Sequence, residues 1–481
     1  MKTQNDPIEM TATEAVRCLN SGKLSPMELL DAALHRHQKV DEQVNAIPTL
    51  CAERARAHAE KLSTVQAPDD GRPWLAGLPI VVKDLADVEG VRTTKGSLIY
   101  KDRIAERSDI MVEMLEARGA IVFGKSNTPE FGAGAHTFNE VFGVTRNPWD
   151  LTKSAGGSSG GSAAALASGQ AWLATGSDFG GSLRNPASFC SVVGFRASPG
   201  RVARGPRTHS FGMMSIEGPM ARTVGDVAMM FDCQIGHHPF DPISLPAPEV
   251  PFSTTLEDTP VLSKIGYSPD LGGISPVSRE VRDVLSSAVK LLQDARFEVD
   301  HSGPDFSDAN EIFAVLRAEQ FVTNFGHLLE SHPDTLKPDI VWNIEQGRKL
   351  NAADIGKAER ARGNLFQRVA QWFGEFDLLL CPSTIVPPFD VEDRFVKEVE
   401  GHTFENYSQW MAICYAITLT GCPSISIPCG FTHEGLPVGM QIVGKPRGER
   451  ALLAAAHRFE QIFDVASRTP ITPENSIIME K

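Results

Sequence analysis

The sequence predicts an α/β protein, because short apolar runs alternate with helical segments along most of its length. Residues 78–83 form a β-branched run with the continuous hydrophobicity of a buried strand. A helix that Ser108 caps and Gly119 ends follows it, and residues 120–123 form the next apolar run. This order of strand, helix and strand is typical of parallel strands with helices packed on their faces.

Two helices are expected before the first strand. Thr11 and Glu14 have the spacing of a capping box, and so do Ser25 and Glu28; Pro26 occupies the first position of the second helix. We therefore expect residues 1–63 to be mostly helical.

The alternation continues after the first strands. Patterning predicts helices over residues 224–231, 278–295, 407–418 and 449–462, and strands over residues 264–267, 377–381, 424–428 and 438–443. A Pro-rich span at 237–260 marks a boundary or a surface excursion. Residues 305–375, largely helical and charged, are expected to form a lobe over the site.

Composition excludes several classes of protein. The chain has 481 residues, of which 42% are hydrophobic and 22% charged, as in ordinary globular proteins. A net charge of −14 disfavours nucleic acids and anionic membranes as partners. The sequence contains neither a secretory type of apolar segment at the N-terminus nor an apolar run of membrane-spanning length, so we expect a cytoplasmic protein. Eight scattered cysteines suggest buried thiols rather than disulfides.

The stretch 154–190 is the most unusual part of the chain. It places eight glycines in the 27 positions from 156 to 182, where the average composition predicts about two, and these glycines flank Ser158, Ser159 and Ser182. A flexible linker is the simplest interpretation of Gly and Ser in such numbers. The helix-forming run 163–167 and the apolar residues 172–174 argue instead for a folded segment.

Neither a metal nor a cofactor is predicted. The sequence has no His-Glu-x-x-His spacing, and His237 and His238 lie in the Pro-rich span. The glycines at 156–161 match neither of the common nucleotide-binding loops.

A serine nucleophile has more support. Ser158 and Ser159 each fit Gly-x-Ser-x-Gly, but residues 147–153 before them read as a turn rather than the apolar strand that a nucleophile elbow requires. Gly180 and Gly181 allow successive N–H groups to point at one spot beside the Ser182 hydroxyl, as an oxyanion requires.

The base for such a nucleophile is one of 13 histidines or a lysine. Lys83 ends the apolar run 80–82, and burial there would lower its pKa towards a useful value. The alternative is a lysine that leaves the strand end into solvent. The match of Ser287 and Lys290 to Ser-x-x-Lys falls on a predicted helix and is interpreted as coincidence.

Several of these segments together closely resemble the signature of the amidase signature family of serine hydrolases. The resemblance spans about residues 10–235 and 375–465. It rests on residues 156–162 and 176–186, and on the shorter motifs at 79–84, 125–131, 146–150 and 435–445.

The resemblance implies a fold and a set of roles. The fold is a single α/β/α domain around a large twisted mixed sheet, made of an N-terminal helical part (1–63), a signature core (75–235), a variable helical lobe (236–375) and the rest of the core (376–465). Ser182 is then the nucleophile, Ser158 the bridging serine on a cis peptide and Lys83 the base. Oxyanion N–H groups come from Phe179, Gly180, Gly181 and Ser182, and the supporting residues are Ser159, Ser177, Asp178 and Arg184.

The substrate remains open between three hypotheses. The first is a free-standing amidase for small apolar or aryl amides, and also carbamates or esters; residues 406–410 suggest an apolar pocket for them. The second is the glutamine-hydrolysing component of a tRNA-dependent amidotransferase, whose relatives favour Met-Asp-Glu-Phe where this chain has Thr128 to Phe131. The third is a silent scaffold, against which the intact Lys83, Ser158 and Ser182 argue. A homodimer is compatible with the first hypothesis.

Overall fold

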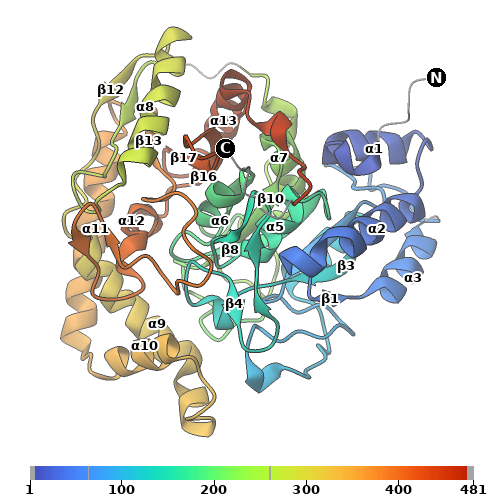
Figure 1. The fold of residues 1–481 in the computed structure, drawn as a ribbon, viewed down its shortest axis with the longest axis horizontal. Coiled ribbons are helices and arrows are strands. Elements are labelled where there is room, and N and C mark those ends of the chain that lie inside the picture. The colour runs from blue at the N-terminus through green and yellow to red at the C-terminus, as the bar shows by residue number, and fades with distance from the viewer. Residues whose placement is uncertain (1–5, 63, 259–261, 474–481) are drawn as a thin grey trace, which may run out of the picture.

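A large mixed sheet forms the centre of the molecule in a computed structural model that describes residues 6–62, 64–258 and 262–473 (Figure 1). Within these residues the sheet has eleven strands. In spatial order they are β1 (Thr49–Leu50), β3 (Ile121–Ser126), β2 (Pro79–Lys83), β8 (Leu173–Asp178), β10 (Ile216–Ala221), β9 (Val193–Arg196), β16 (Ser424–Phe431), β17 (Pro437–Gly444), β13 (Leu378–Pro382), β11 (Ile265–Tyr267) and β12 (Val299–His301).

The strand directions differ between the ends and the centre of the sheet. β2 runs parallel to β3 and β8, and β11 runs parallel to β12 and β13, as the alternation of strands and helices predicts. The central neighbours β8, β10, β9, β16 and β17 pair antiparallel. The expected mixed α/β sheet is therefore confirmed.

Helices cover both faces of this sheet. α5 and α6 pack against each other and against the central strands, and α7, α8 and α13 form a second group on the same strands. The helices are α1 (Ala12–Asn20), α2 (Pro26–Val44), α3 (Ala52–Leu62), α4 (Ile110–Ala117), α5 (Gly160–Ala167), α6 (Arg184–Cys190), α7 (Val224–Gln234), α8 (Arg279–Asp294), α9 (Ala309–Ser331), α10 (Pro338–Arg348), α11 (Ala352–Trp372), α12 (Ala412–Thr420) and α13 (Glu449–Phe463).

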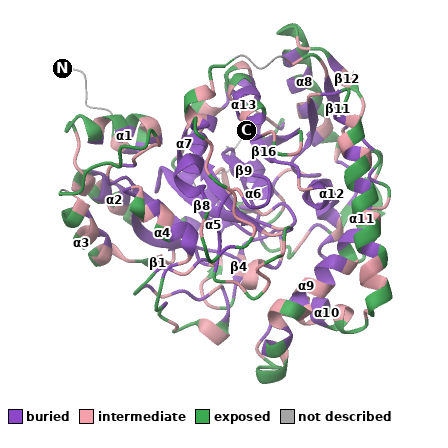
Figure 2. Cartoon of the chain, turned by 180° about the vertical axis from the view of Figure 1, so that it is seen from behind, coloured by how far each residue is buried: buried purple, intermediate pink, exposed green. Residues whose placement is uncertain are grey.

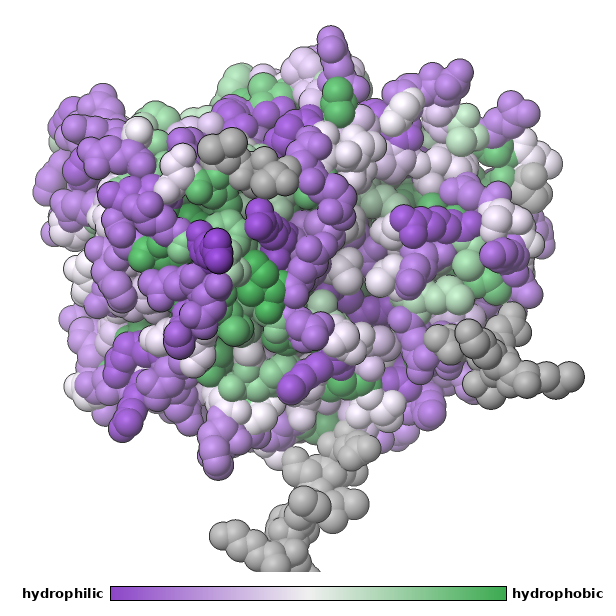
Figure 3. Space-filling model, turned by 90° about the horizontal axis from the view of Figure 1, so that it is seen from above, coloured by the Kyte–Doolittle hydropathy of each residue, from purple (hydrophilic) through white to green (hydrophobic). Residues whose placement is uncertain are grey.

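The core lies where the sheet meets α5 and α6. Every residue of these two helices is buried, and Figure 2 shows them and β8 in purple at the centre, whereas α3 and α11 carry exposed residues outside. Figure 3 shows one face of the surface, on which hydrophilic residues predominate around a central apolar strip. In the part of the chain described, no helix combines the length and apolar character needed to cross a membrane. The cytoplasmic location stays a prediction.

Helix starts test the capping predictions. Thr11 with Glu14, and Ser25 with Glu28, form the expected capping boxes, and Pro26 begins α2. The cap predicted at Ser108 is wrong. α4 begins at Ile110 after Asp109, and Ser108 Oγ instead accepts a hydrogen bond from Glu89 N (3.0 Å).

Two further segments differ from the sequence prediction. Residues 147–153, expected as a turn, belong to a small hairpin of β6 (Arg146–Asn147) and β7 (Asp150–Ser154), which pair with each other outside the main sheet. The helix expected over 407–418 starts at Ala412, because a 3-10 turn at Gln409–Met411 precedes it. Other short hairpins join β4 (Phe138–Asn139) to β5 (Gly143–Val144) and β14 (Glu398–Val399) to β15 (His402–Thr403).

Candidate active site

Lys83 ends β2 deep inside the molecule, with 1% of its surface exposed, so the solvent-exposed alternative is wrong. Its Nζ lies 2.7 Å from Ser158 Oγ, and 2.9 Å from both Ser159 Oγ and Ser177 Oγ. Ser177 comes from the parallel neighbour β8, and the other two serines come from the turn that starts α5. Three hydroxyl groups from two segments thus converge on one buried amine.

The surroundings of this amine favour its neutral form. Burial lowers the pKa of Lys83 well below its ordinary value, and the attraction of Asp178 offsets only part of that effect. A neutral amine has two N–H donors and one lone pair, and hydroxyl groups can either accept or donate. Two of the serine hydroxyls can therefore accept from Nζ while the third donates to it.

The peptide bond between Gly157 and Ser158 is cis, as expected. Gly157 packs against the backbone after Ala135, where a Cβ atom would lie 2.9 Å from His136 N. Only glycine fits this close approach, so the glycine at 157 allows the turn that brings Ser158 to Lys83.

Ser182 lies half-buried between β8 and α6. Its carbonyl accepts a hydrogen bond from Ser159 N (3.2 Å), which joins the two glycine-rich segments. The preceding Gly181 has φ +114°, and a Cβ atom there would lie 2.6 Å from Cys414 Cβ. Both observations require glycine at 181.

The predicted oxyanion donors are the N–H groups of residues 179–182. Gly181 N donates to Asp178 Oδ1 (3.0 Å), so it would have to share its proton with an oxyanion. The N–H groups of Gly180 and Ser182 have no hydrogen-bond acceptor among the described residues. The assignment of all four donors stays a prediction.

Asp178 organises the loop that carries Ser182. Its carboxylate contacts Arg184 Nη2 (2.8 Å) and Arg196 Nη1 (3.2 Å), and it also accepts from Leu183 N (3.2 Å). Burial alone would raise the pKa of Asp178, but the two guanidinium groups outweigh it and hold that pKa well below the usual range.

Arg184 links this loop to the C-terminal part of the sheet. It donates to Cys414 O and Thr418 Oγ1, each at 3.0 Å, and to Gln441 on β17. The sequence pattern assigns no site role to Arg196, although its cation follows the signature stretch. Its contact with Asp178 depends on the pairing of β9 beside β10, which that pattern does not indicate.

A second buried ion pair lies behind Lys83, and sequence reasoning missed it as well. Lys125 Nζ, at the end of β3, lies 3.0 Å from Asp84 Oδ1, 2.7 Å from Ala86 O and 2.9 Å from Thr93 Oγ1. The charged residue that follows Lys83 directly is the available signal. This pair fixes the chain where it leaves β2.

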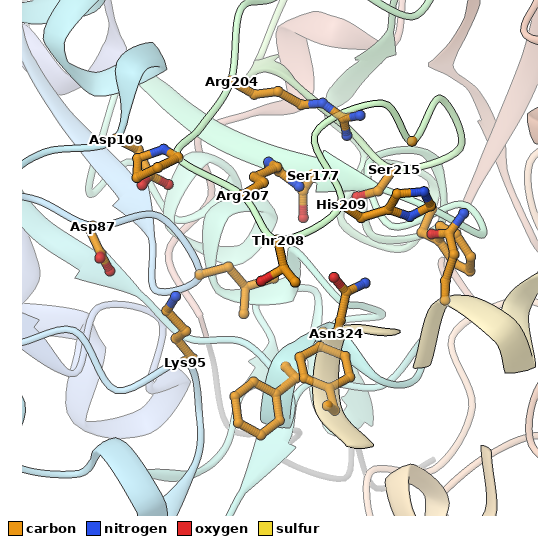
Figure 4. Close-up of a pocket in the computed structure, with 18 of the residues that line it drawn as sticks. Asp87, Lys95, Asp109, Ser177, Arg204, Arg207, Thr208, His209, Ser215 and Asn324 are labelled. Carbon is orange, nitrogen blue, oxygen red and sulfur yellow. The ribbon is translucent and has the colours of Figure 1, made fainter. Parts of the chain in front are cut away.

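A cavity of about 380 Å³ opens beside Ser177 and Phe179 (Figure 4). Its lining combines aromatic and charged side chains, so it is less apolar than the sequence suggests. The aromatic residues are Tyr100, Phe131, Phe179 and Phe325, and the charged ones are Asp87, Lys95, Arg107, Asp109, Arg204, Arg207 and Glu217.

The segment 406–410, expected at an apolar substrate pocket, does not line this cavity. Asn406, Ser408 and Gln409 line a separate cavity of about 390 Å³ that also contacts Phe313. The Phe179 and Phe313 rings, with centroids 5.6 Å apart, lie one at each cavity.

Comparisons with known proteins agree with this geometry. A family model described as Amidase matches residues 28–453. An acylamidase of Rhodococcus erythropolis is 30% identical over 464 residues, which cover 96% of this chain and 97% of that protein.

Two further relatives are similar over their whole length. The matching component of glutamyl-tRNA(Gln) amidotransferase from Synechococcus sp. (strain CC9311) is 32% identical over 488 residues, with 96% of this chain and 99% of that protein covered. A crystal structure of a bacterial aryl acylamidase of the amidase signature enzymes matches with a TM-score of 0.87 at 27% identity, covering 96% of this chain and 99% of that one.

Proposed function

The chain belongs to the Amidase family, whose members hydrolyse carbon–nitrogen bonds, and from this premise we propose that Ser182 is the nucleophile of a free-standing amidase for small amides. The observation that carries this proposal is the buried Lys83 amine within 2.9 Å of three serine hydroxyls. A lysine kept neutral by burial is a base, and a serine between it and the nucleophile can relay a proton.

The proposed reaction has two halves. Ser182 Oγ attacks the amide carbonyl carbon, and its proton passes to Ser158 while the Ser158 proton passes to Lys83. N–H groups of residues 179–182 stabilise the oxyanion that forms. When the C–N bond breaks, the relay returns a proton to the leaving nitrogen, which departs as an amine. Water then attacks the acyl-Ser182 ester with the same relay, and a carboxylic acid leaves.

The lining of the cavity beside Ser177 supports a substrate with a compact aryl or alkyl body. Phe131 and Phe325 have ring centroids 4.8 Å apart and offer an aromatic wall. The similarity to acylamidases favours the same substrate class. Carbamates and esters have the same carbonyl group, so the relay would serve them as well.

A second function, glutamine hydrolysis within a tRNA-dependent amidotransferase, is favoured by the 32% identity to the Synechococcus amidotransferase component. In that case the chain would act with partner subunits. The Thr128-Pro-Glu-Phe131 segment favours the free-standing enzyme instead.

A hydrolysis assay of the purified chain alone distinguishes the two. We expect amine release from 4-nitroacetanilide without any partner, and no change of rate with EDTA, because no step of the relay uses a metal. Glutamine serves as the comparison substrate. Turnover of glutamine only, and only with added partner subunits and tRNA, would overturn the proposal.

A further inference from the structure

Arg204 is a buried cation without a partner in the described part of the chain. Its exposed fraction is 5%, and no hydrogen bond or ion pair from its guanidinium group to a described residue occurs; Nη2 is fully buried and unpaired. Only its backbone N is engaged, by Asp241 Oδ2 (3.0 Å). Burial lowers the pKa of Arg204 to about 9, and the neighbouring Arg207 acts in the same direction. Burying such a charge without a partner is costly.

Other buried arginines near the site differ in this respect. Arg184 and Arg196 are fully buried as well, but both pair with Asp178. An arginine that only stabilises the fold is expected to have such a partner. Arg204 therefore requires another explanation.

The position of Arg204 supplies one, because it lines the cavity that reaches Ser177 and Phe179. Figure 4 shows its side chain along one edge of this cavity, beyond Ser177 and Arg207. Ser177 and Phe179 lie close to the proposed nucleophile in the chain, and Ser177 also contacts Lys83.

The acidic groups of the cavity do not compensate Arg204. Asp87 pairs with Arg103 (Nη1 to Oδ1 2.8 Å), and Glu217 pairs with Arg207. Within the described residues Asp109 forms no ion pair with Arg204, and burial raises its pKa to about 6. Lys95 and Arg107 add positive charge to the same lining.

We infer that Arg204 binds a carboxylate group of the substrate, so that the enzyme acts on small amides with an aryl or alkyl body and one anionic end. The planar guanidinium group matches a carboxylate through two parallel hydrogen bonds, and such a pair is strongest where water is excluded. The aromatic residues of the lining contact the body of the substrate. This inference rests on the proposed function, because it names the substrate class of the same site.

Binding to the Ser182→Ala variant tests the inference without turnover. Two matched pairs of probes cover the two sides of the amide bond: 4-acetamidobenzoate against 4-acetamidobenzamide, and succinanilate against succinanilamide. By isothermal titration calorimetry we expect at least one acid to bind about tenfold or more tightly than its neutral partner. Adding Arg204→Gln should remove that preference.

Two further variants separate the Arg204 contact from general electrostatics. Arg107→Gln removes the same charge from an exposed position of the same cavity, and we expect it to change the preference by less than about threefold. Arg204→Lys keeps the charge without the planar group and should keep only part of the preference. Thermal unfolding checks the fold, and Arg204→Gln should not lower the Tm, because it removes an unpaired buried charge.

If neither acid binds more tightly than its neutral partner, or if the preference survives Arg204→Gln, the inference is wrong. Either result leaves the proposed function standing, provided that wild-type enzyme hydrolyses 4-nitroacetanilide through Ser182. Hydrolysis that does not depend on Ser182 would instead overturn the proposed function.

Discussion

Lys83 connects sequence, burial and chemistry at the scale of single residues. A lysine at the end of an apolar strand is ordinary in sequence, but here it is enclosed by hydroxyl groups and, among the described residues, contacts no carboxylate directly. Burial makes the neutral amine the stable form, and a neutral amine is the form that can accept a proton.

The rate of hydrolysis should therefore depend on the titration of Lys83. Because its pKa is lowered, we expect kcat/KM to rise with pH through a single limb that lies below the ordinary lysine value of about 10.4. Lys83→Ala should lower kcat by about 10²-fold to 10⁴-fold, the usual contribution of a general base. Initial rates with 4-nitroacetanilide from acid to alkaline pH measure both.

Lys153→Ala is a suitable control, since it removes a lysine from β7 outside the cluster. A profile that is flat with pH, or a limb that persists in Lys83→Ala, would contradict a lysine base.

At the scale of elements, the segment from β8 to α6 carries the proposed nucleophile, and Asp178 determines its shape. Asp178 accepts hydrogen bonds from backbone N–H groups of this segment and pairs with two arginines. Removing its charge would leave both guanidinium groups buried without compensation.

Asp178→Asn should accordingly destabilise the protein by about 3–5 kcal/mol, the usual cost of breaking a buried ion pair from one side. Urea unfolding followed by circular dichroism measures this change. Asp70→Asn breaks the half-exposed pair with Arg118 and should cost less than about 1 kcal/mol. Equal effects of the two substitutions would show that burial of the Asp178 pair does not matter.

Local patterns predict some of these elements and not others. The capping boxes and the strand before Lys83 depend on a few neighbouring residues, and the structure confirms them. α6 and β9 are missed, because Pro186 and Gly194 interrupt their patterns and tertiary packing overrides local preference. Ser108 fails as a cap because its hydroxyl meets Glu89 N from another part of the chain.

The same distinction applies to the site. Ser158, Ser182 and Lys83 can be found from sequence because glycines and an apolar strand mark them. Nothing local marks Arg196 or Arg204, since their importance comes from partners, present or absent among the described residues, that the fold alone brings near.

For the whole molecule, one sheet joins segments that are far apart in the chain. β2, β8 and β10 come from the first half and β16 and β17 from the second, and Arg184 contacts both halves. This agrees with our proposal that residues 1–481 form one domain whose core is completed by residues 376–465. The chemistry of the site should then be available in the isolated chain.

Covalent labelling of that isolated chain tests the central claim most directly. A fluorophosphonate reacts with an activated serine, and intact-mass spectrometry with peptide mapping identifies which serine carries the adduct. We expect one adduct per chain, on Ser182, with no adduct on Ser182→Ala and much slower labelling of Lys83→Ala. An adduct on Ser158 or Ser159, or a wild-type chain that is not labelled at all, would contradict the assignment of Ser182 as the nucleophile.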